Sequence, residues 1–361
     1  MSAPVLHIKG QVYVTPEDIR PEVWVVGGRF TFTPPTSGDV QTVTGHALPG
    51  FVDAHCHVGM GPGGAIEPEV ALAQAYADRD AGTLLLRDAG SALDTRFLQD
   101  RDDVPEIIRA GRHIARTRRY MRNYGHEIEP EDLVEYVRHE ARRGDGWVKL
   151  VGDWIHRDVG DLAPCWPVDA LKAAIAAAHE EGARVTAHCF GEQSLVDFAE
   201  AGTDCIEHAT GLTEETVEVF AAKGIAIVPT LVNILTFPQI AEAGEAKFPG
   251  YAAHMRDLHE RRYDTIAAAR EAGVPIFVGT DAGGTIPHGI IAEEMAELTK
   301  AGMSNVEAVS AGCWRAREWL GRPGIEEGAA ADLVVASSNP FDDLSVLARP
   351  QNIVLNGRVV A

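Results

Sequence analysis

The most informative stretch of the chain reads Pro49-Gly50-Phe51-Val52-Asp53-Ala54-His55-Cys56-His57. A Pro-Gly turn leads into a short apolar run that ends in two histidines one residue apart. Side chains two residues apart in a strand point to the same face, so His55 and His57 can bind one metal ion through neutral imidazoles. The pair alone is more typical of ordinary histidines near a strand end. The metal interpretation therefore depends on candidate ligands at the ends of later strands.

Length and composition favour a globular protein. The 361 residues suit a barrel of about 250 residues plus an accessory piece. The 32 basic and 53 acidic residues give a net charge of −21, which argues against a nucleic-acid partner. Met1-Ser2-Ala3-Pro4 has no signal-peptide pattern, and no run approaches the roughly 18 apolar residues of a membrane span, so we expect a cytoplasmic protein without a membrane partner. The five cysteines form no Cys-x-x-Cys pair, which argues against a zinc finger or a disulfide framework.

From residue 50 onward, apolar runs alternate with helical stretches. Eight such alternations predict an α/β fold, a (β/α)8 TIM barrel over residues 49–324. The expected strands are Phe51–His57, Thr83–Arg87, Pro105–Arg109, Trp147–Val151, Arg184–His188, Cys205–His208, Ile225–Pro229 and Pro275–Thr280. The expected helices include Pro68–Ala81, Pro130–Arg143, Pro167–Glu181, Glu214–Ala222 and His254–Ala272, with two more in residues 289–320.

The two ends of the chain show a β pattern without helical periodicity. Short β-prone runs separated by turns occupy residues 4–48, and the pattern returns at Asp332–Ala336 and Ile353–Val360. We predict that residues 1–48 and 325–361 together build one small β-sandwich domain.

Metal-capable side chains recur at the predicted strand ends. Lys149 lies inside the fourth strand, His188 and His208 end the fifth and sixth, and Asp281 follows the eighth. The active sites of TIM barrels gather at the face where the strands end. Together with His55 and His57, these residues predict a metal site.

Lys149 allows two interpretations. Its ammonium could reach outward or pair with an acid. Alternatively, an apolar strand desolvates it and favours the neutral amine, which can react with carbon dioxide to give an anionic carbamate. Two carbamate oxygens could bridge two metal ions.

This combination of motifs resembles the amidohydrolase superfamily. The matching ligands are His55 and His57 on strand one, Lys149 on strand four, His188 on five, His208 on six and Asp281 on eight. The segments around them are similar as well: Leu48–His55 to the family's entry into strand one, and Gly324–Gly328, Ala331–Val335 and Asn356–Val360 to its closing β segment. The resemblance covers nearly the whole chain.

The resemblance implies a binuclear metal centre. His55, His57 and Asp281 would hold one divalent ion, His188 and His208 the second, and N6-carboxylated Lys149 would bridge them. A shared water would lose a proton near neutral pH, and the resulting bridging hydroxide would attack a carbonyl carbon. Asp281 would transfer the proton to the leaving nitrogen. Zinc is the default ion for such a site, with manganese, cobalt or iron as alternatives.

Within the superfamily, Ile206–Gly211 followed by Ile227–Leu231 is similar to the imidazolonepropionase-related group, which includes Xaa-Pro dipeptidases. Gly125-His126 also resembles a loop of those enzymes, whereas Leu150–Trp154 departs from their pattern. The resemblance implies hydrolysis of an amide or related C–N bond in a dipeptide, an N-acyl amino acid or a cyclic amide. A lactone or ester would suit the same site.

Two other functions stay open. A deaminase with a single metal ion would use Glu192 as its proton shuttle, although this glutamate also suits the first turn of a helix. A binding protein that has lost its metals is the alternative outside enzymes, but such proteins lose ligands first, and here all six positions are filled.

Loops after the third and eighth strands supply the candidate substrate contacts. These are Tyr124, His126, Arg122 and His288. Residues 230–250 form a long loop, which is typical of a lid. We expect a small-molecule substrate, and the sequence is compatible with a homo-oligomer. An arginine run is typical either of carboxylate recognition or of a solvated surface that pairs with acids; it comprises Arg109, Arg112, Arg116, Arg118, Arg119 and Arg122.

Overall fold

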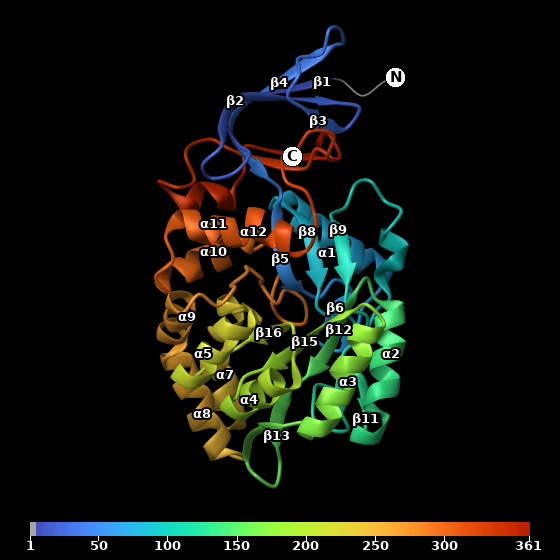
Figure 1. The fold of residues 1–361 in the computed structure, drawn as a ribbon, viewed down its shortest axis with the longest axis vertical. Helices are drawn as coiled ribbons and strands as arrows, with labels where there is room; N and C mark the ends of the chain where they lie inside the picture. The colour runs from blue at the N-terminus through green and yellow to red at the C-terminus, as the bar shows by residue number, and fades with distance from the viewer. Residues whose placement is uncertain (1–4) are drawn as a thin grey trace.

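The computed structural model describes residues 5–361, and the signal-peptide prediction for residues 1–4 lies outside this range. Helices surround a group of parallel strands, and a further sheet built from both chain ends lies at one end of the molecule (Figure 1). The architecture is an α/β fold, as the sequence predicts. Among residues 5–361, every helix is too short or too polar to cross a membrane.

The predicted strands form parallel pairs in the expected order. One sheet has three strands in the order β5-β8-β9, and another has six in the order β11-β10-β12-β15-β16-β17. Seven of the eight predicted strands are present within a few residues of the predicted bounds. They are β5 (Phe51–Cys56), β8 (Thr83–Asp88), β9 (Glu106–Arg109), β12 (Trp147–Val151), β15 (Arg184–Cys189), β16 (Cys205–His208) and β17 (Ala226–Val228); the sheets also contain β10 (Ile114–Arg116) and β11 (His126–Ile128).

The eighth predicted strand, Pro275–Thr280, is not a regular strand. It pairs with β17 through one bridge between Ile227 and Ile276, and Cys56 of β5 pairs with Ala282 just beyond it. Pro275 has no N–H to donate, which limits the ladder on that side. The backbone N–H of Ala54 still donates to Val278, so the segment contacts both neighbouring strands. A closed eight-stranded barrel stays a prediction.

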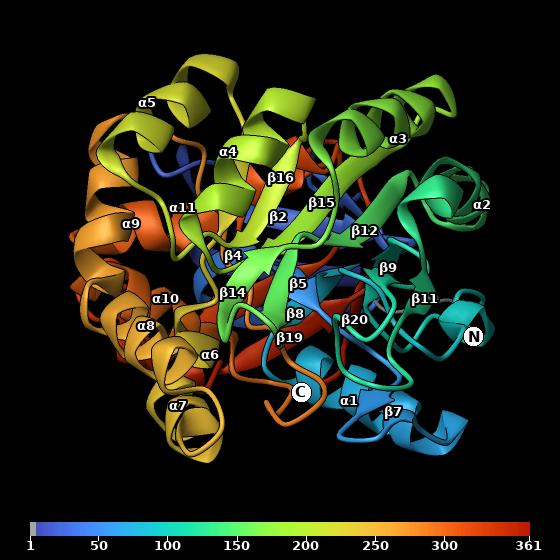
Figure 2. The ribbon, with the colours of Figure 1, turned by 90° about the horizontal axis from the view of Figure 1, so that it is seen from below.

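Helices follow the strands around the outside of the parallel strands (Figure 2). Each predicted helical stretch contains a helix. The helices are α1 (Pro68–Asp80), α2 (Leu133–Arg143), α3 (Val168–Glu180), α4 (Glu192–Ala201), α5 (Glu214–Lys223), α6 (Leu231–Ile234), α7 (Phe237–Glu245), α8 (Pro249–Glu260), α9 (Arg262–Glu271), α10 (Ile291–Lys300), α11 (Asn305–Ala311) and α12 (Trp314–Trp319).

Two helical regions differ from the sequence-based expectation. The stretch 254–272 is divided between α8 and α9, and residues 289–320 contain three helices instead of two. Residues 230–250, predicted as a long loop, contain α6 and α7. Phe237 and Ala241 of α7 are buried against Phe190 and Ile234, so apolar packing holds this segment in place.

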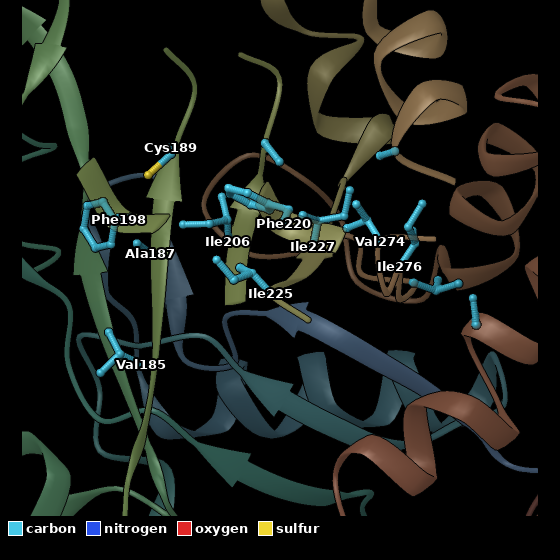
Figure 3. Close-up of a cluster of buried hydrophobic side chains, with 14 of the residues drawn as sticks. Val185, Ala187, Cys189, Phe198, Ile206, Phe220, Ile225, Ile227, Val274 and Ile276 are labelled. Atoms are coloured by element: carbon cyan, nitrogen blue, oxygen red, sulfur yellow. The ribbon is translucent and has the colours of Figure 1, made fainter. Parts of the chain in front are cut away.

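The core between the strands and the outer helices is a continuous apolar cluster. Val185, Ile206 and Ile227 of neighbouring strands face Phe198 and Phe220 of the helices that follow (Figure 3). All five side chains are buried. Burial of one such side chain contributes about 1.5–3 kcal/mol, so this layer fixes the strand ends that carry the candidate site.

Both chain ends contribute to one seven-stranded sheet. Its order is β20-β19-β18-β4-β1-β2-β3, and β18 pairs antiparallel with β4. A separate apolar cluster covers this sheet, with Ile8 and Val25 from the N-terminal part and Leu333 and Val354 from the C-terminal part. The predicted domain bounds and a sandwich of two sheets stay predictions. The strands are β1 (Val5–Tyr13), β2 (Ile19–Val26), β3 (Arg29–Thr31), β4 (Val40–Pro49), β18 (Leu333–Ala336), β19 (Asn352–Leu355) and β20 (Arg358–Val359).

Candidate metal centre

The candidate ligands come from neighbouring strand ends. His55 and His57 lie at the end of β5, Lys149 is in β12, His188 is in β15, and His208 ends β16. All five are buried, and the side chain of Asp281 is 17% exposed. One ligand atom each from His55, His208 and Asp281 lies within 4.8 Å of the other two.

His55, His57 and Asp281 converge on one point. The Nε2 atoms of the two histidines are 3.1 Å apart. Asp281 Oδ1 lies 3.1 Å from Nε2 of His55 and 2.9 Å from Nε2 of His57. Ligands of a tetrahedral zinc ion at about 2.0–2.1 Å lie about 3.3 Å from one another, close to these spacings.

The opposite ring nitrogen of His57 shows which of its two nitrogens carries the proton. Nδ1 of His57 lies 2.6 Å from the carbonyl oxygen of Gly90, which can only accept, so Nδ1 carries the proton. Nδ1 of His55 lies 2.7 Å from Oε2 of Glu207, although the angles are poor for a hydrogen bond. Because His57 is neutral, its Nε2 then presents a lone pair to the carboxylate oxygen of Asp281 at 2.9 Å. A cation between them would remove this conflict, so the residues fit a divalent metal ion.

The second pair of histidines lies beside the first. Nδ1 of His188 is 2.9 Å from Nε2 of His208, and Nδ1 of His208 is 2.7 Å from the hydroxyl of Thr230. The His208 ring centroid lies 5.2 Å from that of His55. The four imidazoles therefore form one continuous cluster.

Burial favours the neutral form of these imidazoles, although the carboxylates of Glu207 and Asp281 outweigh it at His55 and raise the pKa of that ring. Burial lowers the pKa of His57 to about 4 and that of His208 to about 3, and it holds the pKa of His188 well below its ordinary value. These three rings are neutral at neutral pH. Burial raises the pKa of Asp281, but His55 and His57 outweigh this effect and hold it well below its usual range, so the carboxylate is ionised.

Lys149 is buried among these groups. Desolvation lowers the pKa of its ammonium, and the nearby carboxylates of Glu207 and Asp281 offset only part of that effect. Among residues 5–361, no carboxylate lies within ion-pair distance of its Nζ. Burial thus favours the neutral amine, which is the form that reacts with carbon dioxide.

Several site residues have a left-handed backbone. The φ angles are +69° at His208, +49° at Thr230 and +58° at Asp281. This region costs of order 1–3 kcal/mol for a non-glycine residue and persists where the surroundings impose it. The strand ends therefore turn sharply where the candidate ligands converge.

Asp53 fixes the loop that carries Asp281. Its carboxylate accepts hydrogen bonds from the backbone N–H of His55 and from the backbone N–H and hydroxyl of Thr280. Burial raises the pKa of Asp53 to about 7. Asp53 lies in the stretch quoted first, but the sequence gives no sign of its bond to Thr280.

Glu207 supports His55 from below and was not identified from the sequence. Its Oε1 accepts a hydrogen bond from Arg87 at 2.7 Å and also contacts the hydroxyl of Thr186, while Oε2 faces His55. Glu207 and Arg87 are both fully buried. Oε2 of Glu207 thus lies against Nδ1 of His55, on the side of the ring opposite to the candidate ligand atom Nε2.

We expect Glu207→Gln to weaken metal binding by about 10–100-fold, because such supporting hydrogen bonds fix the ligand's tautomer. The measurement is titration of the metal-free protein with zinc against a competing chelator. Glu140→Gln is the matched control. Glu140 of α2 is also fully buried, but its carboxylate pairs with His126 at 2.8 Å and not with a candidate ligand. Equal zinc affinity in a folded Glu207→Gln protein would contradict this role.

The other predicted residues lie around the cluster. The Tyr124 hydroxyl donates to the carbonyl oxygen of Gly61 at 2.7 Å. His126 pairs with Glu140, and Nδ1 of His288 lies 2.7 Å from Asp78, so both histidines contact an outer helix. Arg122 is exposed and lines a cavity. Substrate contacts by these four residues stay predictions.

Three aromatic neighbours of the site gave no sequence signal. The ring centroid of Tyr120 lies 5.3 Å from that of His113, 4.9 Å from that of Trp154 and 5.6 Å from that of His188. His113 is fully buried, and its ring lies 5.1 Å from that of His57. These rings form one wall of the site.

Known proteins resemble this chain, some of them over nearly its full length and others over part of it. A family model described as the amidohydrolase family matches residues 46–360. An uncharacterized protein of Mycobacterium tuberculosis (strain ATCC 25618 / H37Rv) is 52% identical over 354 residues, which cover 98% of this chain and 95% of that protein. Ochratoxinase of Aspergillus niger is 28% identical over 231 residues, which cover 62% of this chain and 47% of that enzyme.

Solved structures show the same fold. A Xaa-Pro dipeptidase with bound methionine in its active site has a TM-score of 0.83 at 22% identity, with 98% of this chain and 99% of that chain covered. The structure of Aspergillus niger ochratoxinase has a TM-score of 0.80 at 19% identity, with coverage of 99% and 96%.

Proposed function

The chain belongs to the amidohydrolase family, and we propose that it is a metal-dependent hydrolase of an amide or related C–N bond in a small molecule. A dipeptide, an N-acyl amino acid or a cyclic amide would suit it, and an ester or lactone would fit the same chemistry. We also propose that residues 49–324 form a closed (β/α)8 barrel and that residues 1–48 and 325–361 form a β-sandwich domain. We expect no nucleic-acid or membrane partner.

The observation that carries the proposal is the convergence of His55, His57 and Asp281. Two ring nitrogens and one carboxylate oxygen lie 2.9–3.1 Å from one another in a buried site. A hydrogen bond pairs a donor with an acceptor, whereas here Nδ1 of His57 carries the proton, so its Nε2 presents a lone pair to the carboxylate oxygen of Asp281. A divalent ion explains this arrangement.

We propose two ions, with zinc as the default for this donor set. His55, His57 and Asp281 would hold one, His188 and His208 the other, and N6-carboxylated Lys149 would bridge them. The neutral Lys149 amine would add to carbon dioxide and release one proton, which turns a buried neutral amine into an anionic ligand. Burial of Lys149 supports this step, because desolvation lowers the pKa of its ammonium.

Bound ions would supply a nucleophile from water at neutral pH and polarise the carbonyl oxygen. Asp281 takes the proton that this nucleophile loses and delivers it to the leaving nitrogen. Oδ1 of Asp281 faces the two histidines, and Oδ2 accepts a hydrogen bond from the Asn233 side chain at 2.7 Å. Asn233 lies in α6, so the segment after β17 orients the proton carrier.

Enzymes that share the fold of this chain support this reaction class. A Xaa-Pro dipeptidase and an ochratoxinase share the fold of this chain. The single-metal deaminase stays the alternative, with Glu192 as the proton carrier. Against it, Glu192 is the first residue of α4, and its carboxylate contacts Arg261 and His254, cations that do not belong to the candidate ligands.

Dialysis against a chelator should abolish hydrolysis, and two equivalents of zinc per chain should restore it. The readout is turnover of a panel of dipeptides, N-acyl amino acids and lactones, with the metal content of each sample measured in parallel. Full activity after complete metal removal would refute the proposal. Tight binding of one ion with unmodified Lys149 would favour the deaminase, and metal binding without turnover of any substrate class would favour a binding protein.

A further inference from the structure

A cavity of about 430 Å³ lies beside the candidate metal centre. Small-molecule sites typically measure about 300–1,000 Å³. Tyr120 lines the cavity and packs on the ring of His188, with 5.6 Å between the ring centroids, so one aromatic side chain separates the cavity from a candidate ligand. The complete lining is Arg118, Tyr120, Arg122, Asn123, Glu127 and Arg157.

The arginines of this lining are not neutralised by the protein. Among residues 5–361, no carboxylate lies within ion-pair distance of the guanidinium groups of Arg118, Arg122 or Arg157. The Glu127 carboxylate accepts the backbone N–H of Arg118 at 3.0 Å instead. Three guanidinium groups and one carboxylate leave two positive charges at the cavity, although the chain has a net charge of −21.

The remaining members of the arginine run have partners within the protein. Arg109 pairs with Asp145, and Arg116 with Glu129. Arg112 donates to the carbonyl oxygens of Asn123 and Tyr124. Buried Arg119 donates to those of Trp154 and Ala163. The structure therefore divides the run into arginines that hold loops together and two, Arg118 and Arg122, that face the cavity.

We propose that this cavity selects substrates that carry two carboxylates on the leaving amine. The inference rests on the proposed function, because the metal centre beside Tyr120 would receive the scissile carbonyl. Guanidinium forks bind carboxylates in two-point contacts, and two uncompensated positive charges match two carboxylates. An N-acyl glutamate or aspartate, or a dipeptide that ends in one, has this arrangement of charges.

The test compares N-benzoyl-L-glutamate with N-benzoyl-L-glutamine, which differ in one carboxylate and hardly in size. We expect zinc-loaded wild-type protein to prefer the glutamate substrate by at least about tenfold in kcat/KM, mainly through KM, since a charged cleft concentrates ligands of opposite charge. The preference should shrink as salt increases. R122Q/R157Q should lower the preference for the glutamate substrate to about equality.

Arg349→Gln is the matched control, because Arg349 is exposed and lies before β19 at the end of the molecule that holds the terminal sheet. Equal kcat/KM for the two substrates in wild-type protein, or a preference that survives in R118Q/R122Q/R157Q, would overturn the inference. Calorimetric measurement of the binding of the same two compounds tests the cavity independently of the hydrolytic reaction. A tenfold affinity difference that disappears in R122Q/R157Q supports the cavity even if neither compound is hydrolysed, and equal affinities overturn it.

Discussion

His55→Ala and His188→Ala should each reduce hydrolysis to background and lower the amount of bound metal. His55 contributes one of three ligand atoms that converge within 3.1 Å, and His188 faces His208 at 2.9 Å. Loss of either imidazole leaves one ion with an incomplete set of ligands. Because the proposed reaction would need both ions, removal of a residue that would hold either of them should abolish turnover.

The measurement combines turnover with metal content per chain for the same preparation. His179→Ala is the matched control, because His179 pairs with Asp204 on the outside of the molecule and its side chain is 43% exposed. We expect the control to keep both turnover and metal. Unchanged turnover and metal content in either ligand variant would exclude that histidine from the centre.

The sequence predicts the candidate ligands because their placement depends on local rules. His55 and His57 are two residues apart at the end of an apolar run, so a strand directs both to one face. His188 and His208 end runs of the same kind, and parallel strands bring their ends to one edge. The structure brings these histidines together with ring centroids 4.7–5.2 Å apart between neighbours.

The contact between Glu207 and His55 could not be predicted from the sequence in the same way. Neighbouring residues of a regular strand point to opposite faces, so a ligand role for His208 argues against a site role for Glu207. The left-handed φ of +69° at His208 ends the strand geometry and removes this rule. The partners of Glu207 are Arg87, which is 120 residues away in the chain, and His55, and such contacts leave no local pattern.

The arginine run shows a second limit of prediction from the sequence. Arg118 and Arg119 are adjacent and look equivalent, but one is exposed beside a cavity and the other is buried against carbonyl oxygens of residues 154 and 163. The difference arises from the hairpin of β13 (Asp153–His156) and β14 (Asp161–Pro164), which supplies the carbonyl oxygens. The position of that hairpin depends on tertiary packing, so the sequence leaves both interpretations of the run open.

Asp281→Asn should lower kcat by at least about 10²-fold, the lower range for the loss of a general acid–base group. The amide keeps the shape of the side chain and one oxygen ligand, but it carries no charge and does not hold the transferred proton. Neighbouring His55 and His57 keep the pKa of the carboxyl well below its usual range, so the wild-type group is ionised before the proton arrives. Substrate binding should change much less, because the cavity and the histidines remain.

The measurement is kcat at saturating substrate, with metal occupancy determined for the same sample and zinc supplied in excess. Asp102→Asn is the control, because Asp102 is an exposed carboxylate that pairs with Arg358 at 2.7 Å near the terminal sheet. Near-wild-type kcat in Asp281→Asn at full occupancy would mean that another group carries the proton. Glu192 would then be the leading candidate, and the single-metal deaminase would become the better explanation of the site. A loss of kcat with full occupancy and unchanged substrate affinity would instead separate proton transfer by Asp281 from its role as a ligand.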